Sequence, residues 1–559
     1  MVRLRRFEIS LVVFLLISLL ALIPIYSQNK KSVLPDTTKK TAQNTTRLNL
    51  PDVIIYGEDK AIRKAGEKIN RLHERAKLIA PDVDFIHIQK SSFVDQKSSF
   101  PGRIEKSGSR KRLQLSYGRF QEINLKAGWW QEHSKFHFSG SGEYSRSSGQ
   151  YENSQYSKNN FESNFGTNLT NELALNSQLG IELLNYGIYG AQINGLKRNA
   201  SNISFHLDNR WMESGNQSLF TSFHFRNSRF QDEGLNFKKS DLNEQQFGIE
   251  VNYHLKYRTA YFFIKTFYNH YDLQTTDGEN LSQNYFRINP SLVFPLAKYL
   301  SFNLGIIYED MEAQPSFSRS RLSPEIQVIF TPLNSLGVKF RGSRGFIPVK
   351  FSQWWERNLF ISQNFGQTPI IRQYEFNLAV EYFPGTFLSV KSEFNRQRLK
   401  QGVYWKRNSE SGLFELQRLD CYDVTEWRTT ARLNISSKIV LEGGIIYTFD
   451  SIKDDSLQSQ SPHLPYTEKI SLPVNLKYRL NNTFLASIHF KLVGPRHVSL
   501  ISDETLRGYG LFSIELEKRI YNYFSTYLVG NNLLNQDYQL WQGYPAMGIH
   551  LTLGIQANW

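Results

Sequence analysis

The last thirteen residues of the chain alternate between apolar and polar side chains without interruption. One face of this predicted strand carries seven apolar residues, Met547, Ile549, Leu551, Leu553, Ile555, Ala557 and Trp559. Strands in soluble sheets average about 5 to 6 residues, whereas a tilted strand that spans a bilayer needs about 9 to 11. The length of the run therefore favours a membrane-spanning strand, with the terminal aromatic ring at the boundary between lipid and water.

Similar alternating segments recur along the chain. The clearest predicts a hairpin from Lys469 to Val493, with two amphipathic strands joined at Asn481 and Asn482. Pro473 predicts a bulge in the first strand, because proline cannot donate a ladder hydrogen bond. Short turns alternate with longer polar connections, as periplasmic turns alternate with extracellular loops in outer-membrane barrels. We expect an all-β fold, a large antiparallel transmembrane β-barrel of about 22 strands over residues 109–559.

The longer polar connections are predicted to be loops. They lie at residues 147–157, 231–243, 272–284, 344–371, 400–420, 450–465, 494–508 and 531–546. In the fourth of these loops, Phe346, Trp354, Trp355 and Phe360 are candidates for contact with a substrate, since loops on a rigid scaffold often carry binding residues. The alternative is that these aromatic rings anchor the loop by packing.

The composition agrees with a barrel and excludes other classes of protein. A mean hydropathy of -0.44 is too low for a bundle of apolar membrane helices, and the 14% aromatic content suits two interfacial girdles. The net charge of +15 comes from Lys and Arg scattered over turns and polar strand faces. This distribution favours contact with anionic outer-membrane lipid head groups over contact with nucleic acid.

The first 108 residues are organised differently from the rest. Three arginines precede an apolar run from Ile9 to Ile25, which predicts a signal peptide over residues 1–27; an uncleaved anchor helix is the alternative. Residues 28–108 form the predicted periplasmic N-terminal segment. Within it we expect a disordered tether at residues 29–46, an extended strand at residues 50–57 and one amphipathic helix from Glu58 to Ile79.

The sequence contains no recognisable motif for catalysis or for cofactor binding. Cys421 is the single cysteine, and the twelve histidines do not cluster at the spacing of metal ligands. Neither a Gly-x-Ser-x-Gly elbow nor a phosphate-binding Gly-Lys-Ser/Thr loop occurs. We therefore expect no enzyme activity, no catalytic residues, no metal site and no cofactor.

Two regions resemble the barrels of TonB-dependent receptors. Near the C-terminus the resemblance is carried by Leu506-Arg507-Gly508-Tyr509, by residues 529–535, by Tyr538 and by Gly543-Tyr544-Pro545 with Gly548. In the middle it is carried by Arg344-Gly345-Phe346 with Pro348, by Thr368-Pro369 and by the strand from Gln373 to Tyr382 with Phe383-Pro384-Gly385. The chain departs from that family in ending on Trp559 rather than phenylalanine.

The resemblance implies uptake or binding of an unidentified substrate at the outer membrane of a Gram-negative cell. It also implies that the extended strand is a TonB-box-like segment, Pro51, Asp52, Val53, Ile54, Ile55, Tyr56 and Gly57, which would pair with a TonB-type energising protein; docking on the barrel wall is the alternative. Residues 28–108 are too few for a complete plug domain, so a separate plug or lipoprotein subunit is a second candidate partner. The alternative function is an outer-membrane scaffold or assembly partner that recruits another protein through its N-terminal segment.

Overall fold

The computed structural model of the chain describes residues 108–559, except residues 134, 171, 194, 214–215, 235–236, 277–279, 315, 366–368, 454–462, 482 and 522. The predicted signal peptide, tether, TonB-box-like strand and amphipathic helix all lie outside the described residues. They stay predictions.

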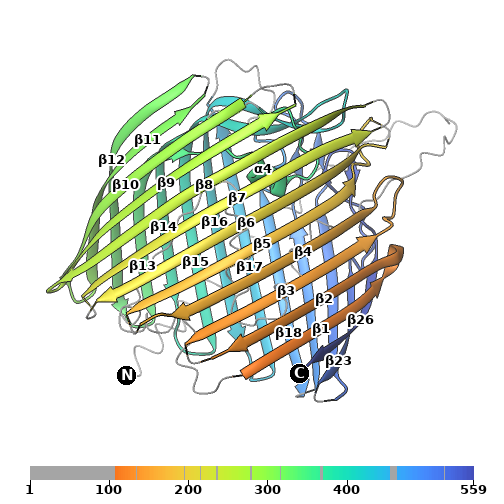
Figure 1. The fold of residues 1–559 in the computed structure, drawn as a ribbon, viewed down its shortest axis with the longest axis horizontal. Coiled ribbons are helices and arrows are strands. Elements are labelled where there is room, and N and C mark those ends of the chain that lie inside the picture. The colour runs from red at the N-terminus through yellow and green to blue at the C-terminus, as the bar shows by residue number, and fades with distance from the viewer. Residues whose placement is uncertain are drawn as a thin grey trace, which may run out of the picture. The chain divides into compact units, whose positions relative to one another are not determined.

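Twenty-two antiparallel strands form one sheet (Figure 1). The first eleven are β1 (Gly108–Gly118), β2 (Glu122–Glu132), β3 (Phe136–Ser147), β4 (Tyr156–Asn168), β5 (Leu173–Gly187), β6 (Lys197–Glu213), β7 (Gln217–Gly234), β8 (Phe237–Tyr257), β9 (Ala260–Thr275), β10 (Asn280–Ala297) and β11 (Leu300–Ala313). The others are β12 (Phe317–Leu333), β13 (Leu336–Ile347), β14 (Ile370–Tyr382), β15 (Leu388–Arg407), β16 (Phe414–Asn434), β17 (Ile439–Ile452), β18 (Ile470–Asn481), β19 (Phe484–Val493), β22 (Tyr509–Arg519), β23 (Phe524–Asn531) and β26 (His550–Asn558).

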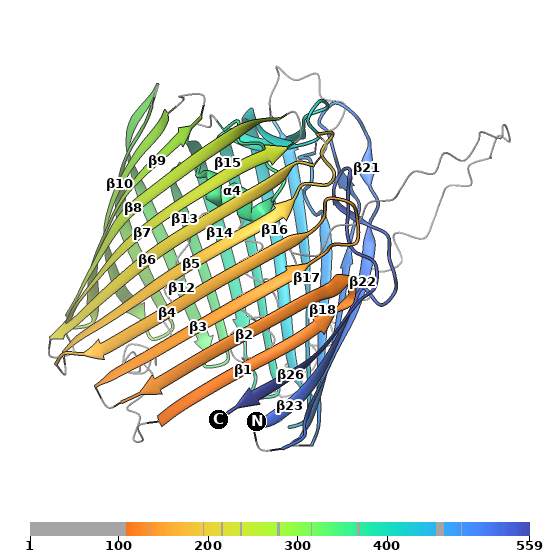
Figure 2. The ribbon, with the colours of Figure 1, turned by 45° about the vertical axis from the view of Figure 1, so that its right-hand side comes forward.

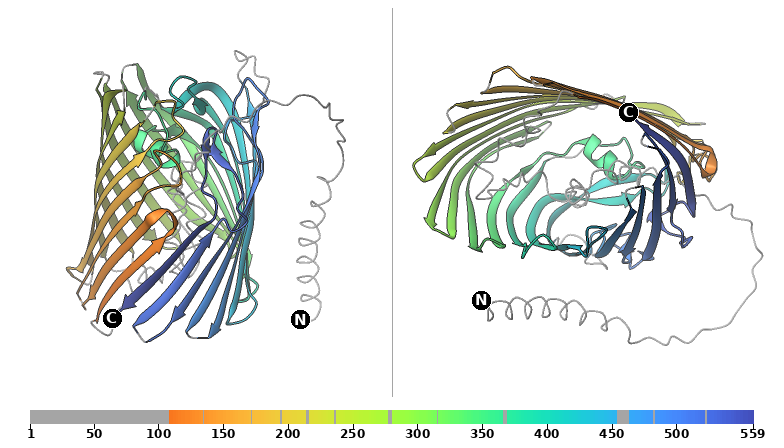
Figure 3. Two further views of the ribbon diagram at one scale, coloured as in Figure 1. Left: turned by 90° about the vertical axis from the view of Figure 1, so that its right-hand side faces the viewer. Right: turned by 90° about the horizontal axis from the view of Figure 1, so that it is seen from below.

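The sheet closes on itself, because β1 pairs with both β2 and β26. The strands therefore surround a lumen, which the view along the barrel shows (Figure 3). Closure gives each strand of the barrel a partner on both sides and removes the exposed edges of an open sheet. The predicted fold class and the predicted number of strands are confirmed.

The short elements outside the barrel wall lie in connections between its strands. They are η4 (Arg119–Gln121), α4 (Phe351–Arg357), β20 (Arg496–His497), β21 (Thr505–Leu506), β24 (Gln539–Trp541) and β25 (Tyr544–Pro545). We call the end of the barrel that carries the connection 348–369 the loop end, and the opposite end, with the connections 298–299 and 334–335, the turn end. None of the helices in the described part of the chain is long and apolar enough to cross a membrane.

Three predicted loops are largely strand. The ladder between β15 and β16 continues through Lys400 and Cys421 to Arg407 and Phe414, so that residues 400–420 form a paired hairpin. Likewise, residues 231–243 and 272–284 are mostly the ends of β7, β8, β9 and β10. Their length and overall polarity led to the prediction of loops. In the hairpin of β15 and β16, however, Val403, Trp405 and Leu416 are buried in a hydrophobic cluster.

Inward and outward faces alternate as predicted from residue 550 onward. Leu551, Leu553 and Ile555 are 47%, 62% and 55% exposed on the outer face, whereas Gly554 and Gln556 are buried on the lumen side. Met547 does not belong to this row. It is buried in the connection before β26, which begins at His550.

The bulge predicted at Pro473 is absent from the described ladder. Pro473 pairs in register with Lys491 of β19, and the register shift of that hairpin falls between Arg479 and Asn481 instead. On the other side, the pairing of β18 with β17 lapses between the pairs Gly443–Val474 and Ile446–Ser471. The missing N–H of proline is therefore accommodated by a gap in one ladder rather than by an extra residue.

The face assignment predicts an asymmetric response to charge. Leu553→Lys places an ammonium group against lipid and should destabilise the barrel by on the order of 2 to 4 kcal/mol, depending on depth. The adjacent Thr552→Lys points toward the polar lumen and should cost much less. Reversible unfolding in lipid vesicles measures both variants. A larger loss for Thr552→Lys would reverse the assignment of the two faces.

Candidate functional site in the barrel lumen

The connection between β13 and β14 folds into the barrel. Its helix α4 lies inside the ring of strands near the loop end (Figures 2 and 3). The lumen-facing side chains that hold this connection come from two neighbouring stretches of wall, β8 to β10 and β5 to β7.

On the first stretch, the buried carboxylate of Glu244 receives the start of α4. The backbone N–H of Ser352 donates to Glu244 Oε2 at 2.7 Å, and the hydroxyl of Tyr271 donates to the same oxygen at 3.3 Å. The N–H of Phe351 in turn donates to the Tyr271 hydroxyl at 3.0 Å. Lys350 Nζ donates to Gln246 Oε1 at 3.0 Å. The first backbone N–H groups of α4 are thus satisfied by the barrel wall rather than by water.

On the second stretch, a buried ion pair forms a hydrogen bond to a later part of the same connection. Arg198 forms two hydrogen bonds of 2.6 Å with the carboxylate of Asp232, and its Nη1 donates to the carbonyl of Leu359 at 3.1 Å. Tyr186 donates to that carbonyl at 2.7 Å and accepts a bond of 2.9 Å from Trp355 Nε1. Because Arg198 and Asp232 are both buried, their pairing and these additional bonds are needed to offset the loss of hydration.

An aromatic cluster joins this connection to other loops. Phe360 stacks on Tyr544 with ring centroids 3.9 Å apart, and Phe414 contacts Tyr544 at 5.8 Å and Trp541 at 5.0 Å. The Tyr544 hydroxyl donates to the carbonyl of Gly412 at 3.1 Å. Burial raises the pKa of Tyr544, so its hydroxyl stays protonated. The loop end of the lumen therefore contains a packed core made from the protein's own loops and from side chains of the wall strands.

The four aromatic residues predicted to contact a substrate are packed to different degrees. Trp355 and Phe360 are buried in the cluster just described, and Phe346 is buried against Phe317 in a smaller one. Trp354 is half-buried, and the Arg357 guanidinium lies 4.2 Å from its ring centroid. Burial lowers the pKa of Arg357 to about 9. These positions make the four rings anchors of the loop; their contact with a substrate stays a prediction.

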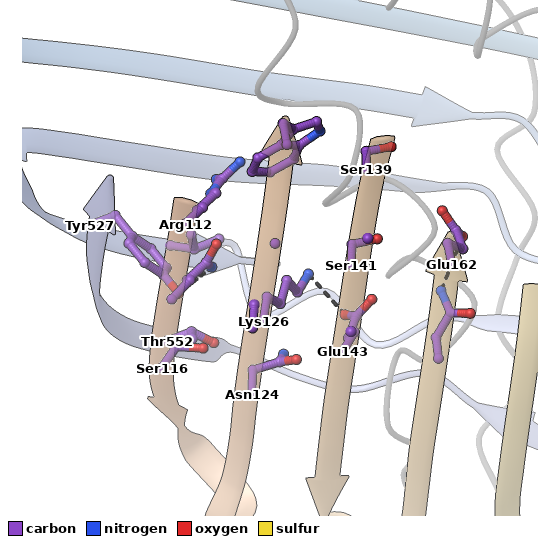
Figure 4. A pocket seen from close by; sticks show the side chains of 18 of the residues that line it. Arg112, Ser116, Asn124, Lys126, Ser139, Ser141, Glu143, Glu162, Tyr527 and Thr552 are labelled. Carbon is purple, nitrogen blue, oxygen red and sulfur yellow. Dashed lines mark hydrogen bonds and ion pairs between the residues drawn. The ribbon is translucent and has the colours of Figure 1, made fainter. Parts of the chain in front are cut away.

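A polar cavity of about 370 Å³ lies along the wall built from β1 to β4, β22, β23 and β26 (Figure 4). Lys126 and Glu143, which are paired on the neighbouring strands β2 and β3, form an ion pair of 2.9 Å in its lining, and Arg112 donates to Gln556 at 2.7 Å. Asn164 donates to Ser139 at 3.3 Å. Sequence reasoning missed this cavity because its residues form no motif. The only available signal was the row of small and polar residues on the inward face of β3.

The described residues do not form a metal site of the usual kind. Their His, Cys, Asp and Glu side chains nowhere gather in a group of three that could hold a metal ion. His206, for example, lies 2.8 Å from Asp208, and His270 lies 2.9 Å from Asp272, each as a single pair.

The buried pair predicts how firmly the inward loop is held. Arg198→Met leaves Asp232 buried without its cation and should destabilise the protein by on the order of 3 to 5 kcal/mol. The matched control is Arg229→Met on β7, which breaks the exposed pair with Asp241 and should cost about 0 to 1 kcal/mol. Limited trypsin digestion should then cut faster after Arg357 in the first variant only. Equal cleavage in both variants would show that this ion pair does not hold the loop.

Comparison with known proteins shows the fold. No family model and no curated protein matches the chain. Among solved structures, the chain is similar to the FrpB iron transporter from Neisseria meningitidis (F3-3 variant), with a TM-score of 0.66 at 11% identity over 84% of this chain and 83% of that one. It is also similar to the copper transporter OprC, with a TM-score of 0.63 at 10% identity over 82% and 81% of the two chains. The ferric-catecholate import receptor Fiu from E. coli K12 gives a TM-score of 0.64 at 10% identity over 81% and 82%. The chain therefore shares the barrel fold of these transport proteins.

Proposed function

We propose that the protein is an outer-membrane transporter or receptor that binds a solute and admits it through the barrel lumen. The observation that carries this proposal is the combination of a closed 22-stranded barrel, an apolar outer face and a polar lumen. A scaffold would need the wall but not the polar cavity, whereas a solute path needs both. The neighbours named for copper, iron and ferric-catecholate transport support passage of a solute without selecting one.

The position of β1 supports an energised mechanism. β1 begins at Gly108, which pairs with Glu132 beside the turn that leads to β3. The strand therefore starts at the turn end, which faces the periplasm in outer-membrane barrels. A segment that precedes β1 would leave the wall on that side, within reach of a periplasmic partner. The TonB-box-like residues Pro51 to Gly57 would pair with the edge of the partner's sheet. A separate plug or lipoprotein subunit would act at the same end.

We propose no enzymatic role. The structural neighbours are named as transporters and receptors, and the cavity of the described barrel contains paired charges rather than a nucleophile held beside a base.

Fractionation tests the location. The protein should be recovered in the outer membrane and should migrate faster in a gel when it is not boiled, because a closed barrel resists detergent. Liposome swelling then tests passage, with Arg198→Met expected to admit small solutes faster than the native protein. A soluble periplasmic protein would refute the proposal. A membrane protein that passes no solute in either form would favour the scaffold alternative.

Strand addition by the N-terminal segment predicts a specific defect. Val53→Pro removes a backbone donor and should lower photo-crosslinking from position 56 to the energising protein at least several-fold, while the barrel still assembles. The control is Thr41→Pro in the predicted tether, which should crosslink normally. Equal crosslinking by both variants would favour docking of this segment on the barrel wall.

A further inference from the structure

Two adjacent tryptophans of β2 are equally exposed on opposite faces of the wall. Trp129 is 42% exposed in the outward row with Ile123 and Leu125, where an apolar ring meets lipid. Trp130 is 41% exposed, but it belongs to the inward row with Asn124 and Lys126 and lines the polar cavity. An indole that faces an aqueous lumen is not stabilised by contact with lipid. Exposed apolar surface in such a place marks a site of interaction.

Gly128 determines how this indole lies. A Cβ atom at position 128 would come within 2.6 Å of Trp130 Cη2 and 3.0 Å of Cζ3. The ring therefore lies back along its own strand, over the glycine, instead of standing out across the lumen. The six-membered ring of the indole covers Gly128, and 41% of the Trp130 side chain remains exposed beside the cavity. Any larger residue at position 128 would displace the ring.

Polar side chains of β3 and β4 line the cavity beside the ring. Ser139 lies directly opposite Trp130 in the β2–β3 register, and Asn164 lies opposite Ser139 on β4. Ser141 and Glu162 form the next pair along the same two strands, and the Asn160 amide donates to Glu162 at 3.2 Å. Amides, hydroxyls and a carboxylate supply both donors and acceptors. Their short side chains also leave the space from which the cavity is made.

The charges that line the cavity argue against an anionic ligand. Its lining holds two cations, Arg112 and Lys126, and four carboxylates, Glu122, Glu143, Glu162 and Glu515, and Lys126 is already paired with Glu143 at 2.9 Å. An anionic chelate would require cations that are not already matched by carboxylates. The volume of about 370 Å³ is near the lower limit of ligand pockets, which span roughly 300 to 1,000 Å³. The cavity therefore suits a small molecule without negative charge, whose hydroxyls can donate to these carboxylates.

We propose that this cavity binds a neutral saccharide during passage through the lumen, an inference that rests on the proposed transport function. A pyranose ring has a face of C–H groups, which would stack on Trp130, and a rim of hydroxyls, which would bond to Asn160, Glu162 and Asn164. Stacking on an indole buries apolar area without requiring a charged partner. Trp130 contributes the platform, and Gly128 is a positioning residue that keeps the platform flat.

Calorimetry on the full chain tests the proposal. The protein is purified in a detergent without a sugar head group, and maltose, cellobiose and mannobiose are titrated in turn. At least one should bind. Trp130→Ala should then weaken that binding tenfold or more, and Gly128→Val should weaken it similarly by displacing the ring. Trp130→Phe should fall between these variants and the native protein, and the matched control Trp129→Ala should bind as the native protein does.

Two outcomes overturn the saccharide site. One is the absence of binding by all three disaccharides, and the other is native affinity in Trp130→Ala. Faster migration of each unboiled variant in a gel confirms that its barrel is folded. If Trp130→Ala fails this check, Trp130→Phe and Gly128→Val decide the question. Failure of the outer-membrane fractionation would count against the transport function instead, so the two failures are distinguishable.

Discussion

The pairing of the first strand with the last is the interaction on which the rest of the barrel depends. β1 and β26 pair from Arg112–Asn558 to Gly118–Thr552, and Lys111 and Trp559 exchange backbone hydrogen bonds of 2.7 and 3.0 Å. In lipid an unpaired backbone N–H or C=O group costs several kcal/mol, roughly, because no water replaces the lost bond. An open sheet of this size would expose two whole edges. Closure therefore decides whether the sequence is stable in a membrane at all.

Closure also separates the side chains into two environments. Outward positions such as Leu553 meet lipid and contribute stability by burial of apolar surface, whereas inward positions meet one another across the lumen. Charged residues become tolerable inward because other strands supply their partners. Arg198 is fully buried and yet satisfied, since Asp232 comes from the next strand and the carbonyl of Leu359 comes from the inward loop.

The lumen contains two different regions, a packed core at the loop end and a polar cavity along one part of the wall. At the loop end, α4 and the aromatic cluster around Phe360 and Tyr544 form a core. Along the wall beside the closing seam, small residues on β2 and β3 leave a cavity with an indole on its floor. The core narrows the lumen at the loop end, and the cavity offers a binding site for a solute inside it. Both are properties expected of a selective carrier rather than of an open pore.

The sequence by itself determined the local features. An apolar period of two over nine or more residues specifies which side chains of β26 face lipid. The alternation of short and long connections gave the number of strands, and an even number places the start of the first strand and the end of the last strand on the same side of the membrane. These features depend on neighbours in the chain, so the pattern contains them. The length of the strands was predicted less well. The ladder of β15 and β16 continues through residues predicted to be a loop, where apolar side chains such as Trp405 and Phe414 pack in the loop core rather than against lipid.

The tertiary structure alone decided the features that join distant residues. The cavity brings Gln114 within 2.5 Å of Tyr527, and the loop core brings Tyr186 within 2.7 Å of Leu359. The sequence identified Phe346, Trp354, Trp355 and Phe360 as one loop, but it did not reveal that the loop turns inward to meet Glu244 and Arg198. Such contacts depend on the tilt and register of the whole barrel, and these are fixed only when the sheet closes. The role of Trp130 follows from the same cause, because its position in the chain beside Trp129 does not reveal which of the two rings lines a cavity.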